Sequence, residues 1–343
     1  MFRVFEAQNA DSVWVQIADA FKNGEGCAQP SRAGGTFEIL HSAMSIANPI
    51  ERWILSRAPA INIAFAIAEV VWILRGRNDS SFLNYFNRQL PKFAGRDETY
   101  HGAYGYRIRR SLGIDQLERA YLALRSNANS RQIVLQIWDS RTDLPDEDGK
   151  AASPDIPCNI VAILRTRNQK LEWMQVMRSN DMYRGLPYNI VQFTMLQEVM
   201  AGWLNLGIGE YNQISNSLHV YERDLHCIES SQEAPAIFNT DSLALPKDES
   251  DRCFQQMELS IERIIDPTIQ SSSLVTMVQH SDLPMSFRNL LCILCAEGAR
   301  RRQDLDLINN LICECTNPVY KYLYGRWLTR FRAKEDTSEF VGV

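Results

Sequence analysis

The sequence predicts a protein that combines β-strands with long α-helices, on two observations. The first is a pair of near-alternating apolar runs, residues 159–164 and 171–177, which flank a polar tip. This pattern is typical of two antiparallel strands joined by a short loop. The second is the long, mostly apolar stretch 61–76, which ends in glycine and predicts a buried helix.

Further elements are predicted on both sides of these segments. In chain order they are an amphipathic helix at 12–21, a strand at 130–138, an exposed loop at 139–153, an apolar helix at 190–206, a strand at 215–221 and helical segments within 249–265, 284–299 and 301–332. Because side chains alternate along a strand, His219 and Tyr221 are expected to point the same way.

Length and composition restrict the class of protein. A chain of 343 residues with 45% hydrophobic content can bury a sizeable core, as one large domain or two. The net charge of −5 offers no field for nucleic acid, so any phosphate must be bound by a local arginine cluster. The sequence has no signal-peptide layout and no apolar run of membrane-spanning length, from which we expect a soluble, cytoplasmic protein.

The eight cysteines are irregularly placed and are expected to be reduced thiols. Two pairs, Cys292 with Cys295 and Cys313 with Cys315, have spacings that zinc sites also use. Their Ile and Leu neighbours favour buried helix cysteines, so no metal site is expected.

One cysteine has a distinct setting. Cys158 stands just before the first strand of the predicted hairpin, and the second strand runs into Arg178, Ser179 and Asp181. A Gly-Leu-Pro-Tyr turn then leads to Asn189. A thiol followed by these residue types is a candidate nucleophile with groups that can recognise an anion and an amide.

This arrangement resembles the thymidylate synthase and pyrimidine hydroxymethylase superfamily, with six motifs in the same order over residues 31–225. The resemblance implies an α+β fold with a large mixed β-sheet flanked by helices, and a homodimer with active sites shared between subunits. It fades beyond about residue 235, so we expect a catalytic domain at 1–235 and a helical C-terminal extension at 236–343.

The resemblance also implies roles for individual residues. The catalytic group comprises Cys158 as nucleophile, Glu69 and Tyr104 for proton transfer, and Asp181. The expected contacts to a pyrimidine nucleotide monophosphate are Arg32, Arg131, Arg178, Ser179, Asn189, His219 and Tyr221, with Arg131 reaching the partner subunit's nucleotide. Asp181 and Gly185 would contact the co-substrate, methylenetetrahydrofolate.

Simpler interpretations exist for several of these residues. Arg32 could be a solvated arginine in a glycine-rich turn, and Arg131 an ordinary surface arginine. Glu69 could reach solvent from its helix, and His219 could be a core histidine. Gln132 stands where the family has a second phosphate-binding arginine.

The identity of the base and of the product depends on a few positions. The Asn189 amide can pair with the ring N–H and carbonyl of uracil, which favours dUMP and, with the Gly-Leu-Pro-Tyr segment, the methyl product dTMP. Leu90 replaces a family tryptophan, and only Phe340–Val343 could imitate the family's C-terminal tail, which favours hydroxymethylation of dUMP, dCMP or CMP. A catalytically lapsed, nucleotide-binding regulatory protein is the alternative of another class.

Overall fold

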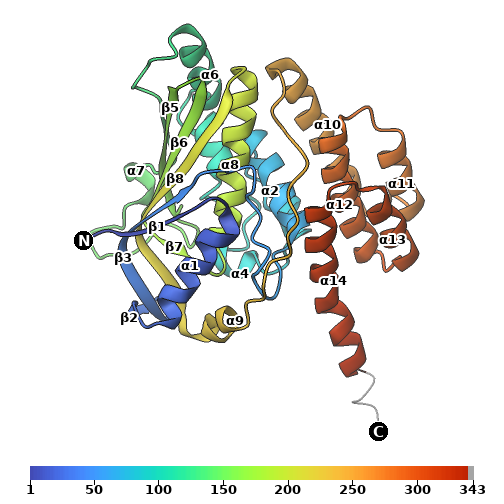
Figure 1. Cartoon of the computed structure of the whole chain (residues 1–343), viewed down its shortest axis with the longest axis horizontal. Helices are drawn as coiled ribbons and strands as arrows, with labels where there is room; N and C mark the ends of the chain where they lie inside the picture. Colours follow the sequence, from blue (N-terminus) through green and yellow to red (C-terminus); the bar gives the residue numbers. More distant parts are fainter. Residues whose placement is uncertain (339–343) are drawn as a thin grey trace.

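An eight-stranded mixed β-sheet forms one side of the computed structural model, which describes the backbone of residues 1–338 and side chains as far as residue 331 (Figure 1). The strand order is β1-β3-β8-β6-β5-β4, with β2 added to β3 and β7 added to β8. The strands are β1 (Arg3–Ala7), β2 (Cys27–Ser31), β3 (Gly34–Ile46), β4 (Val134–Gln136), β5 (Asn159–Arg167), β6 (Lys170–Met177), β7 (Asn180–Asp181) and β8 (Gly207–Tyr221). Parallel β1–β3, β6–β8 and β7–β8 pairs alongside antiparallel pairs confirm the predicted mixed sheet.

The predicted hairpin is β5–β6, and both strands extend further into the polar tip than expected. Thr166 pairs with Leu171 and Arg167 with Lys170, which leaves Asn168 and Gln169 as a two-residue turn. Both turn residues have positive φ, 50° and 58°, as tight hairpins require. The strands are longer because backbone pairing continues where the apolar alternation stops.

Helices α1 and α8 pack on one face of the sheet, and α2 packs on α8. The helices of this part are α1 (Ala10–Lys22), α2 (Ile63–Leu74), α3 (Ser80–Asn84), α4 (Pro91–Ala94), α5 (Tyr104–Tyr106), a π-helical turn (Arg107–Ser111), α6 (Gln116–Ser126), α7 (Ser140–Asp143), α8 (Leu186–Trp203), a 3₁₀ turn (Glu222–Asp224) and α9 (Leu225–Glu229). The prediction of an apolar helix at 190–206 placed its start too late. Pro187 is tolerated in the first turn of a helix, so the Gly-Leu-Pro-Tyr segment opens α8 instead of preceding it.

Two predicted segments between residues 130 and 153 also differ. The strand is confined to Val134–Gln136, and Arg131 lies outside it on the surface. The predicted exposed loop contains the short helix α7, whose Asp143 is buried beside Arg107. Sequence composition shows polar residues there but not the partner that allows one of them to be buried.

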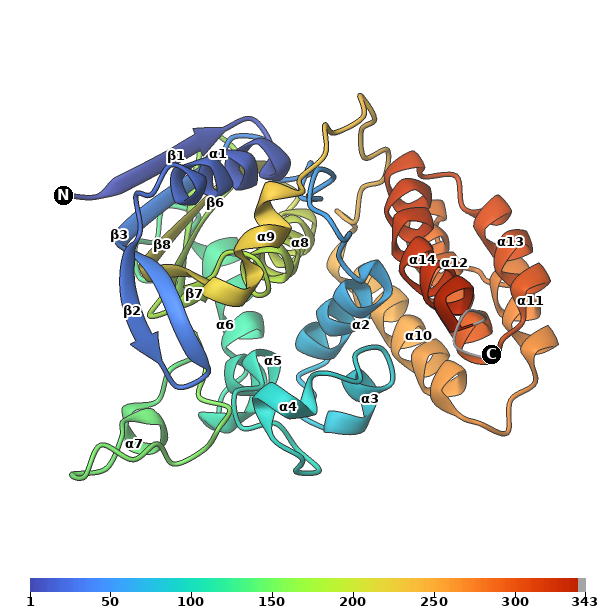
Figure 2. The same ribbon diagram turned by 90° about the horizontal axis from the view of Figure 1, so that it is seen from below.

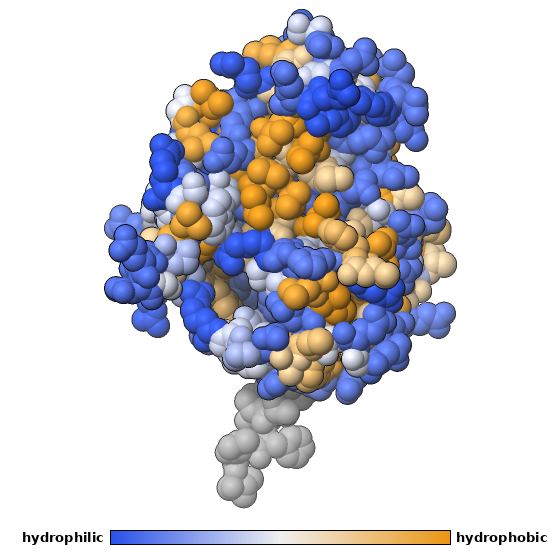
Figure 3. Space-filling model, turned by 90° about the vertical axis from the view of Figure 1, so that its left-hand side faces the viewer, coloured by the Kyte–Doolittle hydropathy of each residue, from blue (hydrophilic) through white to orange (hydrophobic). Residues whose placement is uncertain are grey.

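The face of the sheet opposite α1 and α8 carries partly exposed apolar side chains. Two rows of paired residues cross the strands, one through Val134, Ile163 and Met174, the other through Val161, Val176 and Ile214. Val134 is 48% exposed and Met174 38%. Figure 3 looks at this side of the molecule and shows hydrophobic residues gathered near its middle.

The C-terminal part is helical, as predicted, and packs beside α2 (Figure 2). Its helices are α10 (Lys247–Ile265), α11 (Ser271–Gln279), α12 (Met285–Arg301), α13 (Leu305–Glu314) and α14 (Pro318–Ser338). The segment 301–332 is divided because the Asp304 side chain caps α13 and Asn317 caps the start of α14. Residues 340–343, considered as a tail, lie outside the described residues.

The cysteines of this part follow the prediction with one exception. Cys292 and Cys295 are buried in α12, and Cys315 is buried just after α13, whereas Cys313 is exposed on α13. Across the described helices, none combines the length and apolar character needed to cross a membrane.

Candidate active site

Cys158 and Arg178 meet where β5 begins and β6 ends. The backbone N–H of Arg178 donates to the carbonyl of Cys158 (2.9 Å), and its guanidinium donates to the carbonyls of Pro157 and Ile156 (both 2.9 Å). Burial raises the pKa of the Cys158 thiol, and this effect outweighs the opposite influence of Arg178 and Arg32. The two arginines favour the thiolate, but only against a larger desolvation cost.

Arg32 lies in the turn between β2 and β3 and reaches across to the strand entry at Cys158. Its guanidinium donates to the carbonyl of Pro154 (3.0 Å). The arginine is exposed, yet it acts electrostatically on both Cys158 and Asp155. It is therefore a cation at the edge of the site, and not simply a solvated turn residue.

Glu69 projects from α2 toward α8. Burial raises the pKa of its carboxyl group to about 7, against the lowering effect of a hydrogen bond with Gln192. Its Oε2 atom is buried and has no hydrogen-bond partner among the described residues. A carboxyl group with one buried, unpartnered oxygen and a pKa near neutrality is suited to proton transfer.

Tyr104 stands at the start of α5, stacked against Phe193 of α8 with ring centroids 6.1 Å apart. Burial, and then the neighbouring Cys158, raise the pKa of its hydroxyl group, while a hydrogen bond with Asn159 lowers it. Glu69 acts on the same hydroxyl group. The structure thus brings Tyr104, Cys158 and Glu69 together from three separate parts of the chain.

The segment from β7 into α8 holds Asp181, Gly185 and Asn189. Asp181 Oδ1 accepts hydrogen bonds from the N–H groups of Tyr183 and Arg184 (both 2.9 Å), and Gly185 N–H donates to the Asp181 carbonyl (3.0 Å). Burial raises the pKa of the Asp181 carboxyl group. Asn189, in the first turn of α8, is 7% exposed.

His219 and Tyr221 share one face of β8, as the alternation predicts. Their rings meet edge to face with centroids 5.5 Å apart, whereas Leu218 and Val220, which alternate with them along the strand, are buried. His219 pairs in register with Asp181 of β7, which places it next to the entrance of α8. It is partly exposed and therefore not a core histidine.

Two predicted residues are less well placed. Arg131 is exposed beside β4, at the edge of the sheet, and forms no ion pair with a residue whose side chain is described. Ser179 is partly buried after β6, between Arg178 and Asn180. Neither position gives a direct contact with Cys158.

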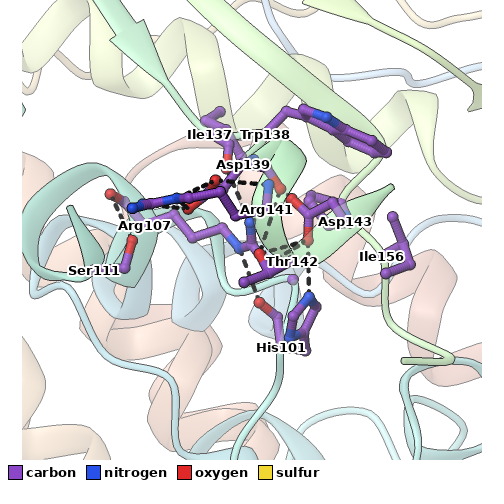
Figure 4. A network of polar contacts seen from close by, with 12 residues as sticks. His101, Arg107, Ser111, Ile137, Trp138, Asp139, Arg141, Thr142, Asp143 and Ile156 are labelled. Atoms are coloured by element: carbon purple, nitrogen blue, oxygen red, sulfur yellow. Dashed lines mark hydrogen bonds and ion pairs between the residues drawn. The ribbon is translucent and has the colours of Figure 1, made fainter. Parts of the chain in front are cut away.

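Sequence patterns missed a polar network beside the site (Figure 4). The buried Asp143 carboxylate binds the Arg107 guanidinium through both oxygens (2.6 and 2.9 Å) and contacts His101 Nε2 (2.8 Å). Arg107 in turn donates to the carbonyls of His101 and Ile137. This network fixes the loop that precedes Tyr104, and no local sequence signal connects its members.

Arg184 was also missed. It forms an ion pair with Asp224 (2.7 Å), and its guanidinium lies 5.5 Å from the ring centre of Phe93 and 6.0 Å from that of Tyr221. Phe93 is 45% exposed, so an aromatic surface stands next to the Asp181–Gly185 segment. The position of Arg184 directly after Tyr183, inside the motif, was the only signal for it in the sequence.

These features define the class of protein: an α+β fold whose partly buried thiol lies near arginines, a near-neutral carboxyl group and a buried amide, as covalent chemistry on an anionic substrate requires. The sequence model of the thymidylate synthase family matches residues 18–266. The chain therefore belongs to the thymidylate synthase family.

Several relatives are phage enzymes. The chain is 34% identical over 211 residues to the deoxyuridylate hydroxymethyltransferase of Bacillus phage SP01, a match that covers 58% of this chain and 54% of the relative. It is 33% identical over 205 residues to the deoxyuridylate hydroxymethyltransferase of Pseudomonas phage M6, covering 59% and 57%. The thymidylate synthase of Francisella tularensis subsp. holarctica is 28% identical over 197 residues, covering 54% and 69%. The chain thus spans little more than half of each phage relative.

Proposed function

We propose that this protein transfers a one-carbon unit to the fifth carbon of dUMP through a covalent adduct with Cys158, and that water completes a hydroxymethyl product. The observation that carries the proposal is the convergence of Cys158 with Glu69 and Tyr104 beside two arginines. The names of the two phage relatives support the hydroxymethyl product, which the sequence left as an alternative.

Cys158 is the proposed nucleophile. Its thiolate adds to the sixth carbon of the pyrimidine, which makes the fifth carbon nucleophilic. Methylenetetrahydrofolate supplies the electrophilic one-carbon unit. Glu69, with a pKa of about 7, is poised to give and accept protons around the base, together with Tyr104.

Asn189 is proposed to select uracil. Its carboxamide offers both an acceptor and donors, and can pair with the ring N–H and an adjacent carbonyl. Asn180 lies 3.4 Å away and fixes the orientation of this amide. Arg32 and Arg178, with Ser179, would bind the phosphate, while His219 and Tyr221 are available for the ribose.

The folate side of the site fits Asp181. Its Oδ1 is occupied by two backbone N–H groups, whereas Oδ2 accepts no hydrogen bond from the described residues. A pterin carries several N–H donors, for which such an oxygen is a matching acceptor. Gly185 and the exposed ring of Phe93 border the same segment.

A homodimer with shared sites is proposed from the apolar side of the sheet. The partly exposed Val134, Met174 and Ile214 lie on a face that a second copy could cover. Arg131 stands at the edge of this face beside β4, where it could reach a partner's nucleotide. We also propose a cytoplasmic location and a division into a catalytic domain, 1–235, and a helical extension, 236–343.

The methyl product is the second candidate, favoured by Asn189 and by the relative named thymidylate synthase. One position argues against it. Leu90, next to α4, stands where the family has a tryptophan, and the smaller side chain leaves less cover against water. Hydride transfer oxidises the folate to dihydrofolate, and hydration does not. Incubation with dUMP and methylenetetrahydrofolate should give 5-hydroxymethyl-dUMP by mass spectrometry without the dihydrofolate absorbance rise.

A dihydrofolate signal equal to nucleotide turnover would instead establish the methyl product. Release of tritium from dUMP labelled at the fifth carbon separates both enzymes from a catalytically lapsed regulatory protein. If nucleotide binds and no tritium is released with any pyrimidine nucleotide, the catalytic proposal fails.

A further inference from the structure

We propose that Asp155 is the general base that activates the water molecule in the last step of hydroxymethylation. This inference rests on the proposed function and adds a residue to its chemistry. Asp155 lies three positions before Cys158, on the segment that enters β5.

The position of the Asp155 carboxylate is set by the loop that carries Tyr104. Asp155 Oδ2 accepts a hydrogen bond from the backbone N–H of Gly102 (2.7 Å). A Cβ atom at Gly102 would lie 2.8 Å from the Asp155 carbonyl oxygen and 3.0 Å from Oδ1. The missing side chain at Gly102 therefore lets the carboxylate pack against the loop two residues before Tyr104.

The second carboxylate oxygen is available. Asp155 Oδ1 accepts no hydrogen bond from the described residues, and the residue is partly exposed, so water can reach it. Asp143, the carboxylate of the neighbouring polar network, differs in this respect. Both of its oxygens bind Arg107, and it also accepts from the N–H of Asp139 (2.8 Å).

Asp155 lies within electrostatic reach of the reacting groups. Its negative charge raises the pKa of both the Cys158 thiol and the Tyr104 hydroxyl group. The charged and titratable groups that face Asp155 are Arg107, Arg32, His101 and Tyr100. Asp155 thus lies close to both the nucleophile and the loop of Tyr104.

The basicity of Asp155 suits this role. Burial raises the pKa of its carboxyl group to about 6, although the Gly102 hydrogen bond and the nearby cations oppose the shift. The carboxylate is therefore mostly ionised at pH 7 and is a stronger base than an exposed aspartate. Glu69, whose Oε2 is buried and has no partner among the residues with described side chains, is assigned to the protons of the base itself.

The step balances without an oxidant or reductant. After the one-carbon transfer, the nucleotide bound to Cys158 carries an exocyclic methylene group on its fifth carbon, conjugated with the carbonyl at the fourth. The water oxygen bonds to this methylene carbon while a water proton passes to Asp155. The electron pair moves to the fourth-carbon carbonyl as an enolate. It then returns to form the double bond between the fifth and sixth carbons and expels the Cys158 thiolate.

The test is Asp155→Asn, which keeps an oxygen that can accept from Gly102 N–H and removes the base. We expect hydroxymethyl-dUMP formation to fall by about 10²-fold to 10⁴-fold. Loss of the fifth-carbon proton precedes water attack, so a burst of tritium release of about one per site should remain. Intact-protein mass spectrometry of the quenched variant should show accumulation of the nucleotide–methylene adduct.

Asp146→Asn is the matched control. Asp146 lies in the same loop region and is exposed, and its carboxylate accepts from the N–H groups of Asp148 and Lys150. This variant should hydroxymethylate at the wild-type rate. As a second variant, Asp155→Ala should regain part of the lost rate with added formate, which can occupy the vacated volume and accept the proton.

The outcomes separate the inference from the proposed function. If wild type forms dihydrofolate with each turnover, the proposed function fails first. If wild type hydroxymethylates and Asp155→Asn does so at a similar rate, only the assignment of Asp155 is overturned. Loss of the tritium burst together with product, and no response of Asp155→Ala to formate, would make Asp155 a structural residue and also overturn it.

Discussion

At the scale of single residues, burial controls the chemistry of the site more than neighbouring charge does. The thiol of Cys158, the carboxyl groups of Glu69, Asp155 and Asp181, and the hydroxyl of Tyr104 all have pKa values raised chiefly by desolvation. These groups are therefore neutral more often than in water.

Replacement of Cys158 should abolish turnover without unfolding the protein. In Cys158→Ala a small side chain replaces the thiol at the start of β5, so nucleotide binding should persist while tritium release disappears. Cys313→Ala, at an exposed position on α13, is the control and should keep full activity. Appreciable turnover by Cys158→Ala would remove this thiol from the mechanism.

Asn189→Asp should shift the preference from dUMP toward the cytosine nucleotide. A carboxyl group in place of the buried amide presents a different pattern of donors and acceptors to the base. The ratio of kcat/KM values for the two nucleotides measures the shift. Asn168→Asp, in the exposed turn of the β5–β6 hairpin, should leave the ratio unchanged. The assignment fails if wild type already prefers the cytosine nucleotide.

The raised pKa of Glu69 has a consequence for stability. Between the ordinary value of 4.5 and about 7 the folded protein holds a proton on Glu69 that the unfolded chain has lost. The free energy of unfolding therefore falls as pH rises through this range. The full loss caused by ionising Glu69 in the folded protein, at most about 3 kcal/mol, is present above pH 7. Glu69→Gln should remove this loss. The free energy of unfolding measured with urea should therefore increase for the variant relative to wild type between pH 5 and pH 8. An equal difference at both pH values would show that Glu69 ionises normally.

At the scale of elements, a buried ion pair connects three segments of the chain. Arg52, before α2, binds Glu198 of α8, and these side chains are 1% and 0% exposed. Glu198 Oε1 also accepts from Ser242 Oγ (3.0 Å) and Leu243 N–H (2.8 Å), at the connection to α10. The pair thus holds the site helices and the C-terminal helices in one arrangement.

Arg52→Leu should destabilise the protein by about 3–5 kcal/mol, because it leaves the buried Glu198 carboxylate without its cation. Arg3→Leu is the matched control, since Arg3 pairs with Glu25 on the surface, where the side chains are 45% and 38% exposed. That change should cost less than about 1 kcal/mol. Urea denaturation of both variants gives the comparison, and similar losses would contradict the role given to the buried pair.

At the scale of the whole molecule, the proposed dimer predicts complementation. Cys158→Ala and Arg131→Ala proteins should each be inactive or weakly active alone. After subunit exchange, a heterodimer has one site with both an intact thiol and an intact partner arginine, so activity should return to at most half of wild type per dimer. Proven heterodimers without recovery would show that each site is built from one chain.

The sequence by itself determined the family and the mixed sheet, and it marked the candidate site residues that remain predictions. These follow from local patterns: the β5–β6 alternation, the apolar run of α2, and motifs in which Cys158, Arg178 and Asn189 stand at fixed spacings. Such patterns record backbone geometry and residue type, which a linear sequence contains.

The tertiary structure alone decided which distant groups meet. Asp155 becomes a candidate base only because Gly102 lies against it, and Arg107 finds Asp143 across 36 positions. It also decided that α8 begins at Leu186 and that burial outweighs the arginines at Cys158. Desolvation depends on everything packed around a group, and no local stretch of sequence contains that information.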